Sequence, residues 1–178
     1  MKKSVLLVIA VVFIVCAVAI SGTAAWLAIR VSVTNTFTVG DISISLTETT
    51  GSEYKLIPGA KISKNPTVSV KAGSVNSWLF VKIEKDNNLD EYVSYALADG
   101  WIELSDGVYY RESTPSYEDV TYNILKDDAV FIKDSVTETM LSAIGSSGNL
   151  PRMSFKAYAI QRSSYENAAD AWEYMKNL

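Results

Sequence analysis

The feature that most constrains the fold is strict alternation near the N-terminus, across residues 26–39. Six of its seven odd-numbered positions are apolar, and the even-numbered positions are mostly polar. The odd-numbered residues are Leu27, Ile29, Val31, Val33, Asn35, Phe37 and Val39. Because successive side chains of a β-strand point to opposite faces, the pattern predicts one half-buried strand. Strands usually have about five or six residues, so this one is long enough to serve two folded units.

The segment before this strand has the three parts of a secretory signal peptide. Residues 2–3 are both lysine, residues 5–20 form an unbroken apolar run, and residues 21–25 are all small. This order predicts that the chain is exported and loses residues 1–25.

Cleavage after Ala25 places Thr23 and Ala25 in the two small-residue positions of the cleavage site and makes Trp26 the first mature residue. An uncleaved anchor is the alternative, because residues 4–29 carry no charge and about 20 apolar residues span a bilayer. Contact with the membrane is expected only through this segment, if it is kept.

The charge of the chain argues against some partners. The predicted signal peptide holds two of the 16 basic residues and none of the 20 acidic ones, so the remainder has a net charge of −6. An acidic chain lacks the basic surface that nucleic acid or anionic lipid requires. We therefore expect no nucleic-acid partner.

The sequence has one cysteine and no histidine, and both facts limit its chemistry. The only cysteine is Cys16, inside the apolar run, so the exported chain has no disulfide framework. The sequence has no histidine, which excludes Ser-His-Asp and Cys-His catalysis and the imidazole ligands of most zinc sites. We expect no enzyme and no cofactor.

After a change of phase at Gly40-Asp41, short apolar or alternating segments recur between turn signals. The expected strands are residues 42–46, 67–71, 78–83, 101–104, 108–111, 122–125, 130–133 and 153–160. Residues 54–57 are a short apolar segment that ends at the turn signal Pro58-Gly59. Residues 78–83 are almost continuously apolar, which is typical of a strand covered on both faces. Residues 105–107, Ser-Asp-Gly, predict a hairpin turn.

Three segments have helical periodicity instead. Apolar spacing predicts a helix over residues 88–97 with Asn88 as its N-cap. A second capping box begins at Ser135 and its short helix is expected to end at Gly145. Ser163 is expected to open a last helix. Its apolar face would hold Tyr165, Ala168, Ala169, Trp172 and Met175.

Many short strands with turn signals about every ten residues predict an antiparallel β-sandwich with a few short helices. No internal repeat or linker interrupts residues 40–178. These residues are therefore expected to form one domain, preceded by the signal peptide and by the 26–39 strand.

Several segments, taken in order, resemble the TasA/camelysin family of Gram-positive surface proteins. They are residues 22–26, 34–40, 42–46, 54–59, 64–74, 78–83 and 155–161. The similarity extends over most of the exported chain. Residues 26–30 are more apolar than the acidic or polar segment that many relatives have there. This difference supports an anchored form more strongly than in a typical relative, while cleavage after Ala25 stays the prediction.

The resemblance implies a signal peptide cleaved by a dedicated SipW-type signal peptidase and a jelly-roll-like sandwich. It also implies a secreted protein of the extracellular matrix or cell surface, a subunit or accessory subunit of biofilm fibres. Its partners would be copies of itself or homologous fibre subunits.

A metalloprotease and a cell-surface adhesin are alternatives to the fibre subunit. A metalloprotease, as camelysin has been described, lacks support because the sequence has no HExxH motif. A cell-surface adhesin or carbohydrate-binding module would need exposed aromatic side chains. Trp78 and Phe80 share one strand face, and Tyr109 and Arg111 share another, but aromatic residues in a sandwich more often belong to the core.

A calcium loop is a further alternative. Residues 86–90 begin like one, but the sixth and twelfth positions are Glu91 and Leu97 where Gly and Glu are required. The start of a helix explains the same residues, and no metal site is predicted.

The long first strand suggests how subunits join. Residues 26–33 are predicted to be a donor strand that completes the sheet of a neighbouring subunit. Leu27, Ile29, Val31 and Val33 would fill the neighbour's open edge, while Phe37 and Val39 stay with the home domain.

Overall fold

The computed structural model describes residues 41–51, 53–86 and 88–177, which belong to one compact unit. The predicted signal peptide and the predicted 26–39 strand lie outside the described residues. The roles predicted for Thr23, Ala25 and Trp26, and for the four donor side chains, therefore remain predictions.

The described chain is mainly β and every strand pair is antiparallel. The strands are β1 (Ile44–Thr47), β2 (Lys61–Ser63), β3 (Thr67–Val70), β4 (Ser77–Lys85), β5 (Val93–Ser94), β6 (Ile102–Ser105), β7 (Val108–Ser113), β8 (Val120–Asn123), β9 (Ala129–Ile132) and β10 (Met153–Gln161). The α-helices are α2 (Leu89–Tyr92), α3 (Glu138–Ser147) and α4 (Ala168–Met175). Two 3₁₀ turns are η1 (Lys126–Asp128) and η2 (Arg162–Ser164). The predicted antiparallel β-sandwich with short helices is confirmed.

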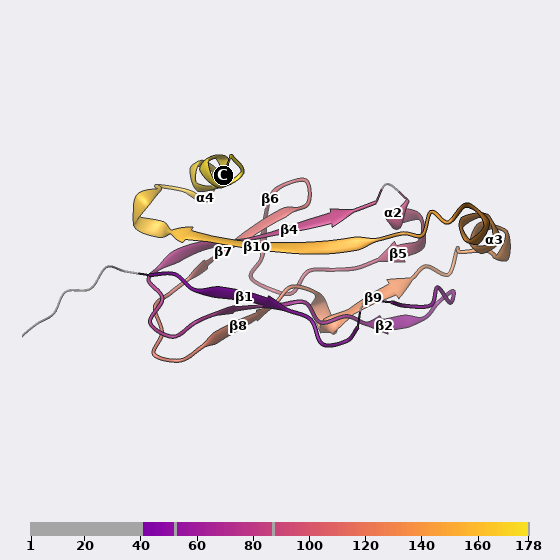
Figure 1. The fold of residues 1–178 in the computed structure, drawn as a ribbon, viewed down its shortest axis with the longest axis horizontal. Helices are drawn as coiled ribbons and strands as arrows, with labels where there is room; N and C mark the ends of the chain where they lie inside the picture. Colours follow the sequence, from indigo (N-terminus) through magenta and orange to yellow (C-terminus); the bar gives the residue numbers. More distant parts are fainter. Residues whose placement is uncertain (1–40, 52, 87, 178) are drawn as a thin grey trace, which may run out of the picture. The chain divides into compact units, whose positions relative to one another are not determined.

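The strands form two layers (Figure 1). One layer is a four-stranded sheet in the order β10-β4-β7-β6. The other consists of two three-stranded sheets, β1-β3-β8 and β2-β9-β5. These two follow one another because β2 leads directly into β3 and β8 into β9.

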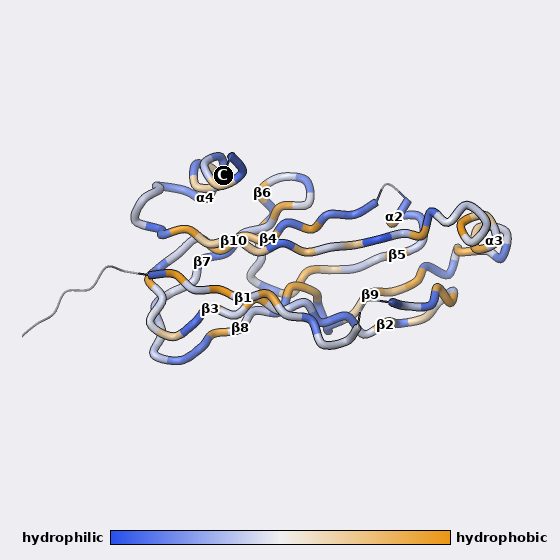
Figure 2. Tube along the Cα trace, in the orientation of Figure 1, coloured by the Kyte–Doolittle hydropathy of each residue, from blue (hydrophilic) through white to orange (hydrophobic). Residues whose placement is uncertain are grey.

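The core lies between the layers. Val68 and Val70 of β3 pack in one buried cluster with Leu79, Val81 and Ile83 of β4. A second buried cluster extends the core through β9, α2 and α3. Hydrophobic residues, orange in Figure 2, accordingly recur along strands of both layers. Alternation places these side chains inward, and their burial drives the layers together.

β4 is buried on both faces, as its sequence predicts. Its outer face carries Trp78 and Phe80, which pack with Ala168 and Ala171 of α4 in a third cluster. The rings of Phe80 and Trp172 lie 5.3 Å apart between centroids. The core interpretation of this aromatic pair is confirmed, since α4 covers the face where a glycan platform would have to lie (Figure 1).

The helix predicted over residues 88–97 is wrong beyond its first turn. α2 ends at Tyr92, and β5 begins at Val93, where Val93 pairs with Ile132 of β9. Val93 would reach the core either in a helix or in a strand, so its burial does not distinguish the two. The pairing with β9 selects the strand. Asn88 makes no capping hydrogen bond with its side chain, which donates to the carbonyl oxygen of Asn149 instead.

The boundaries of the other two helices also differ from the predictions. Thr137, not Ser135, caps α3, its side chain accepting from the N–H of Met140 at 3.3 Å. The helix passes through Gly145 and ends at Gly148, whose φ is 69°. A glycine ends a helix only where the chain adopts this left-handed conformation.

The last helix begins later than expected. Residues around Ser163 form the turn η2, and Asn167 caps α4 by accepting from the N–H of Asp170 at 2.9 Å. The helix buries Ala168 and Ala171 rather than Ala169. Ala168 and Ala171 are three residues apart and so share one helix face, and this face packs against Trp78 and Phe80 of β4.

Candidate functional site

The free edge of β10 is the first candidate site. β10 has nine residues and, among the described residues, pairs only with β4. The N–H of Asp86 donates to the main-chain oxygen of Arg152, and the N–H of Arg162 donates to that of Asn76. Because hydrogen-bonded pairs recur at every second residue of an antiparallel ladder, the even-numbered residues of β10 direct their main-chain groups toward β4. The odd-numbered residues direct theirs to the other side. Apart from Gln161 at the end of the strand, they are Met153, Phe155, Ala157 and Ala159.

These four residues have no main-chain hydrogen-bond partner within the described parts of the chain. The other edge strands are short: β1, β6 and β8 have four residues, β2 has three and β5 has two. β6 also carries a shift of register between Glu103 and Ser105. Short strands, bulges and charges protect a sheet edge from pairing with another chain. β10 is therefore the edge best suited to accept a strand.

A groove of about 900 Å³ opens beside the start of β10, between this strand and β2. Its apolar lining comes from both layers. The apolar residues include Leu56, Ile62, Leu89, Val130, Ile132 and Met153. A strand added along β10 would thus find apolar surface on its inward side.

Lys64 is a buried cation close to Phe155 of β10. Its ammonium group lies 2.7 Å from the carboxylate of Glu48. The same ammonium lies 5.2 Å from the ring centre of Tyr54 and 5.4 Å from that of Phe155. A buried cation with this set of partners holds the segment that contains Glu48 and Tyr54 near β10.

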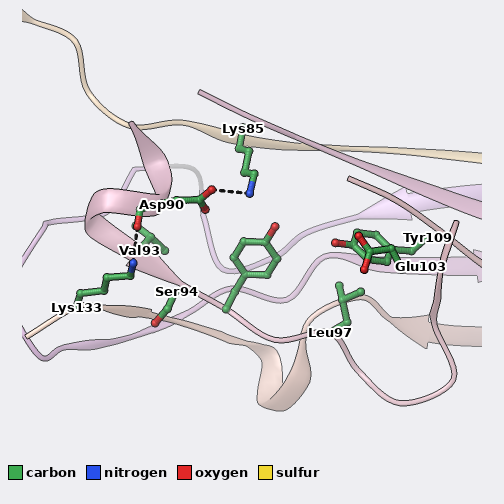
Figure 3. A pocket seen from close by; sticks show the side chains of 9 residues that line it. Lys85, Asp90, Val93, Ser94, Leu97, Glu103, Tyr109 and Lys133 are labelled. Carbon is green, nitrogen blue, oxygen red and sulfur yellow. Dashed lines mark hydrogen bonds and ion pairs between the residues drawn. The ribbon is translucent and has the colours of Figure 1, made fainter. Parts of the chain in front are cut away.

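The second candidate site is a pocket of about 550 Å³ at the opposite edge, between β5 and β6 (Figure 3). Tyr95 and Leu97 come from the segment after β5, Glu103 from β6 and Tyr109 from β7. Lys85, at the end of β4, also lines the pocket.

The two cations of the pocket already have partners. The Lys85 ammonium lies 2.7 Å from the Asp90 carboxylate, and this hydrogen bond raises the pKa of Lys85. Lys133 donates to the main-chain oxygen of Asp90 (Figure 3). By contrast, the hydroxyls of Tyr95 and Tyr109 have no hydrogen-bond partner within the described residues.

Burial raises the pKa of both tyrosines of the pocket, Tyr95 and Tyr109. Desolvation disfavours the phenolate, so both groups are hydroxyls at neutral pH and can donate as well as accept. Tyr109 thus lines a pocket, while Arg111, on the same strand face, lies 3.9 Å over the ring of Tyr122. The sequence places these two residues on one face but does not show that their surroundings differ.

Neither candidate site was predicted from the sequence. Alternation marks β10 as a strand, but only the order of strands in the sheet shows that one of its edges is unpaired among residues 41–51, 53–86 and 88–177. The pocket joins residues from β4 to β7 and Lys133 after β9, and no local motif signals it. The predicted cleavage and donor residues lie outside the described residues, so the structure does not bring them to either site.

No protein-family model, curated protein or solved structure matches this chain. The fold therefore defines the class, an antiparallel β-sandwich domain, by itself. Within residues 41–51, 53–86 and 88–177, no helix is long and apolar enough to cross a membrane. The same residues contain no group of three or more Cys, Asp or Glu side chains placed to hold a metal ion.

Proposed function

We propose that the protein is an exported structural subunit, or accessory subunit, of extracellular fibres on a Gram-positive cell, and that it assembles by donor-strand addition. The free edge of β10 is the observation that carries the proposal. Residues 26–33 of one subunit would pair with β10 of the next. The alternation of residues 26–33 suits this edge, since an added strand needs an apolar face toward the groove and a polar face toward solvent.

Such a contact joins two different surfaces of the subunit. Each subunit offers one donor segment and one acceptor edge, so a pair of subunits still has one of each free. A head-to-tail contact that does not close into a ring propagates as a filament.

The energy terms nearly balance. Burial of Leu27, Ile29, Val31 and Val33 contributes roughly 6–12 kcal/mol. Ordering of eight residues costs about 8–16 kcal/mol of backbone entropy. Main-chain hydrogen bonds to the free edge, at roughly 0.5–1.5 kcal/mol each, decide the sign. We therefore expect assembly to depend on protein concentration.

The donor strand is tested by the double variant Ile29→Asp with Val31→Asp. Two charges on the apolar face of the donor strand should leave folded monomers that form no filaments, as seen by electron microscopy and sedimentation. The matched control is Ala28→Asp with Ser32→Asp, which places the same two charges on the other face of the donor strand and should polymerise. Filaments from the first variant, as abundant as those of the parent, would disprove the donor strand.

The acceptor edge is tested separately by cross-linking. The exported chain has no cysteine, so Ser32→Cys can be combined with Lys156→Cys or Ser154→Cys on the exposed face of β10. Disulfides require Cα atoms within about 7 Å, so only an adjacent donor strand gives covalent multimers under oxidation. Ser32→Cys with Glu103→Cys on β6 should stay monomeric. Cross-linking through β6 but not β10 would assign the acceptor to the other edge.

Export is tested at the predicted cleavage site. Replacement of Ala25 by Glu should block the signal peptidase, which requires a small residue there. The expected result is a larger, membrane-bound form on immunoblots of cell fractions. Release of a product with unchanged mass would exclude cleavage after Ala25.

A further inference from the structure

The pocket between β5 and β6 is lined in part by polar groups that have no hydrogen-bond partner among the described residues. The hydroxyls of Tyr95 and Tyr109 and the carboxylate of Glu103 make no hydrogen bond or ion pair with the described residues. Figure 3 shows the side chains of Tyr109 and Glu103 together at one side of the pocket, and Tyr95 is also among the residues that line it. A ligand that supplies partners to these groups would recover hydrogen bonds now made with water.

The charge of the pocket selects against ions. Its cations are Lys85 and Lys133, and its anions are Asp90 and Glu103, so the lining residues sum to zero. An anionic ligand would face Glu103, with Asp106 near enough to act on the pKa of both tyrosines. A cationic ligand would face the Lys85 ammonium. A neutral ligand meets neither repulsion.

The apolar part of the lining adds a second requirement. Val93 and Leu97 contribute aliphatic surface beside the ring of Tyr95. The volume, about 550 Å³, is within the range of small-molecule sites, roughly 300–1,000 Å³. A pyranose sugar combines apolar C–H faces with hydroxyls around its rim, and so satisfies both the apolar and the polar groups.

We propose that this pocket binds a neutral sugar unit of a glycan. The Tyr95 and Tyr109 hydroxyls donate to or accept from sugar hydroxyls, the Glu103 carboxylate accepts from one, and Leu97 packs against a C–H face. The site would let the protein hold matrix or cell-wall polysaccharide.

Sugar binding and fibre assembly use different edges. β6 and β10 are the two ends of the four-stranded sheet, separated by β7 and β4. A subunit can therefore accept a donor strand on β10 while its pocket holds a sugar. The proposal does not depend on the fibre function, and a monomeric variant should bind sugar equally well.

The test is a titration of the purified exported protein, uniformly labelled with nitrogen-15, with glucose, galactose, mannose and N-acetylglucosamine at millimolar concentrations. At least one sugar should shift the amide signals of Tyr95, Glu103 and Tyr109 in a saturable way. Tyr95→Phe removes one hydroxyl, and Glu103→Gln replaces one accepting carboxylate oxygen by an amide group that only donates, so each should weaken binding roughly 2- to 12-fold. Tyr117→Phe, at a fully exposed tyrosine outside the pocket, should bind like the parent.

Three outcomes would overturn the proposal. The first is that none of the four sugars shifts the pocket amides. The second is that shifts occur but Tyr95→Phe and Glu103→Gln bind like the parent while their thermal unfolding shows a folded domain. The third is that acetate or methylammonium, used as charged probes, occupies the pocket more tightly than any of the sugars.

Discussion

Replacing Phe80 by Ala is expected to lower the free energy of unfolding by about 3–5 kcal/mol. The side chain is fully buried at the centre of β4. Its ring lies 5.3 Å from that of Trp172 in α4 and 6.5 Å from that of Tyr110 in β7, between centroids. The loss of free energy has two parts. One is the transfer free energy of the ring, and the other is the cost of the cavity that remains because α4 and β7 do not close the space fully.

Phe131→Ala is the matched control for this change. Phe131 lies on β9 with 43% of its surface exposed, so its removal should cost less than about 1 kcal/mol. Urea unfolding of the exported protein, in the Ile29→Asp with Val31→Asp background to prevent assembly, measures both values. Equal losses for the two variants would contradict the packing of α4 over β4.

Gly107→Ala is expected to cost about 2–3 kcal/mol, because two penalties coincide at this position. Gly107 ends the turn between β6 and β7 with a φ of 71°, a conformation that favours glycine. A Cβ atom there would lie 2.7 Å from the main-chain oxygen of Ile83. The same residue also accepts a hydrogen bond from the N–H of Ile83 at 2.7 Å, so backbone on both sides would have to shift.

Gly73→Ala separates the two penalties. Gly73 has a φ of 81°, but a Cβ there would meet no atom within 4 Å. This variant should lose only the conformational part, about 1 kcal/mol. Urea unfolding of both variants gives the difference directly. If Gly107→Ala costs no more than Gly73→Ala, the close approach of the β6–β7 turn to β4 is wrong.

Much of the strand content could be predicted because alternation is a local property. Residues 67–71 and 78–83 and the hairpin at residues 105–107 all appear in the structure close to their predicted limits. Each of these segments carries both its periodicity and its turn residues in a short window. The class of fold followed from their number and spacing.

The helix boundaries could be predicted less well, for two physical reasons. Val93 and Ser94 have the apolar spacing of a helix, but β9 offers main-chain partners, and pairing with it turns them into β5. Around Thr137 and Asn167, several neighbouring residues are able to cap a helix. The choice among them depends on which rotation of the helix buries its apolar residues.

By itself, the sequence determined the sandwich class, the absence of histidine chemistry and the alternation of residues 26–39 on which the donor-strand hypothesis rests. The tertiary structure alone decided which strand edge has no partner within the described part of the chain and which side chains meet in the pocket. Strand order and the pairing of distant segments depend on contacts between residues far apart in the chain. Met153 and Lys85 are neighbours only because β10 returns to pair with β4, and Tyr95 and Tyr109 share a pocket only because the two layers close over one core.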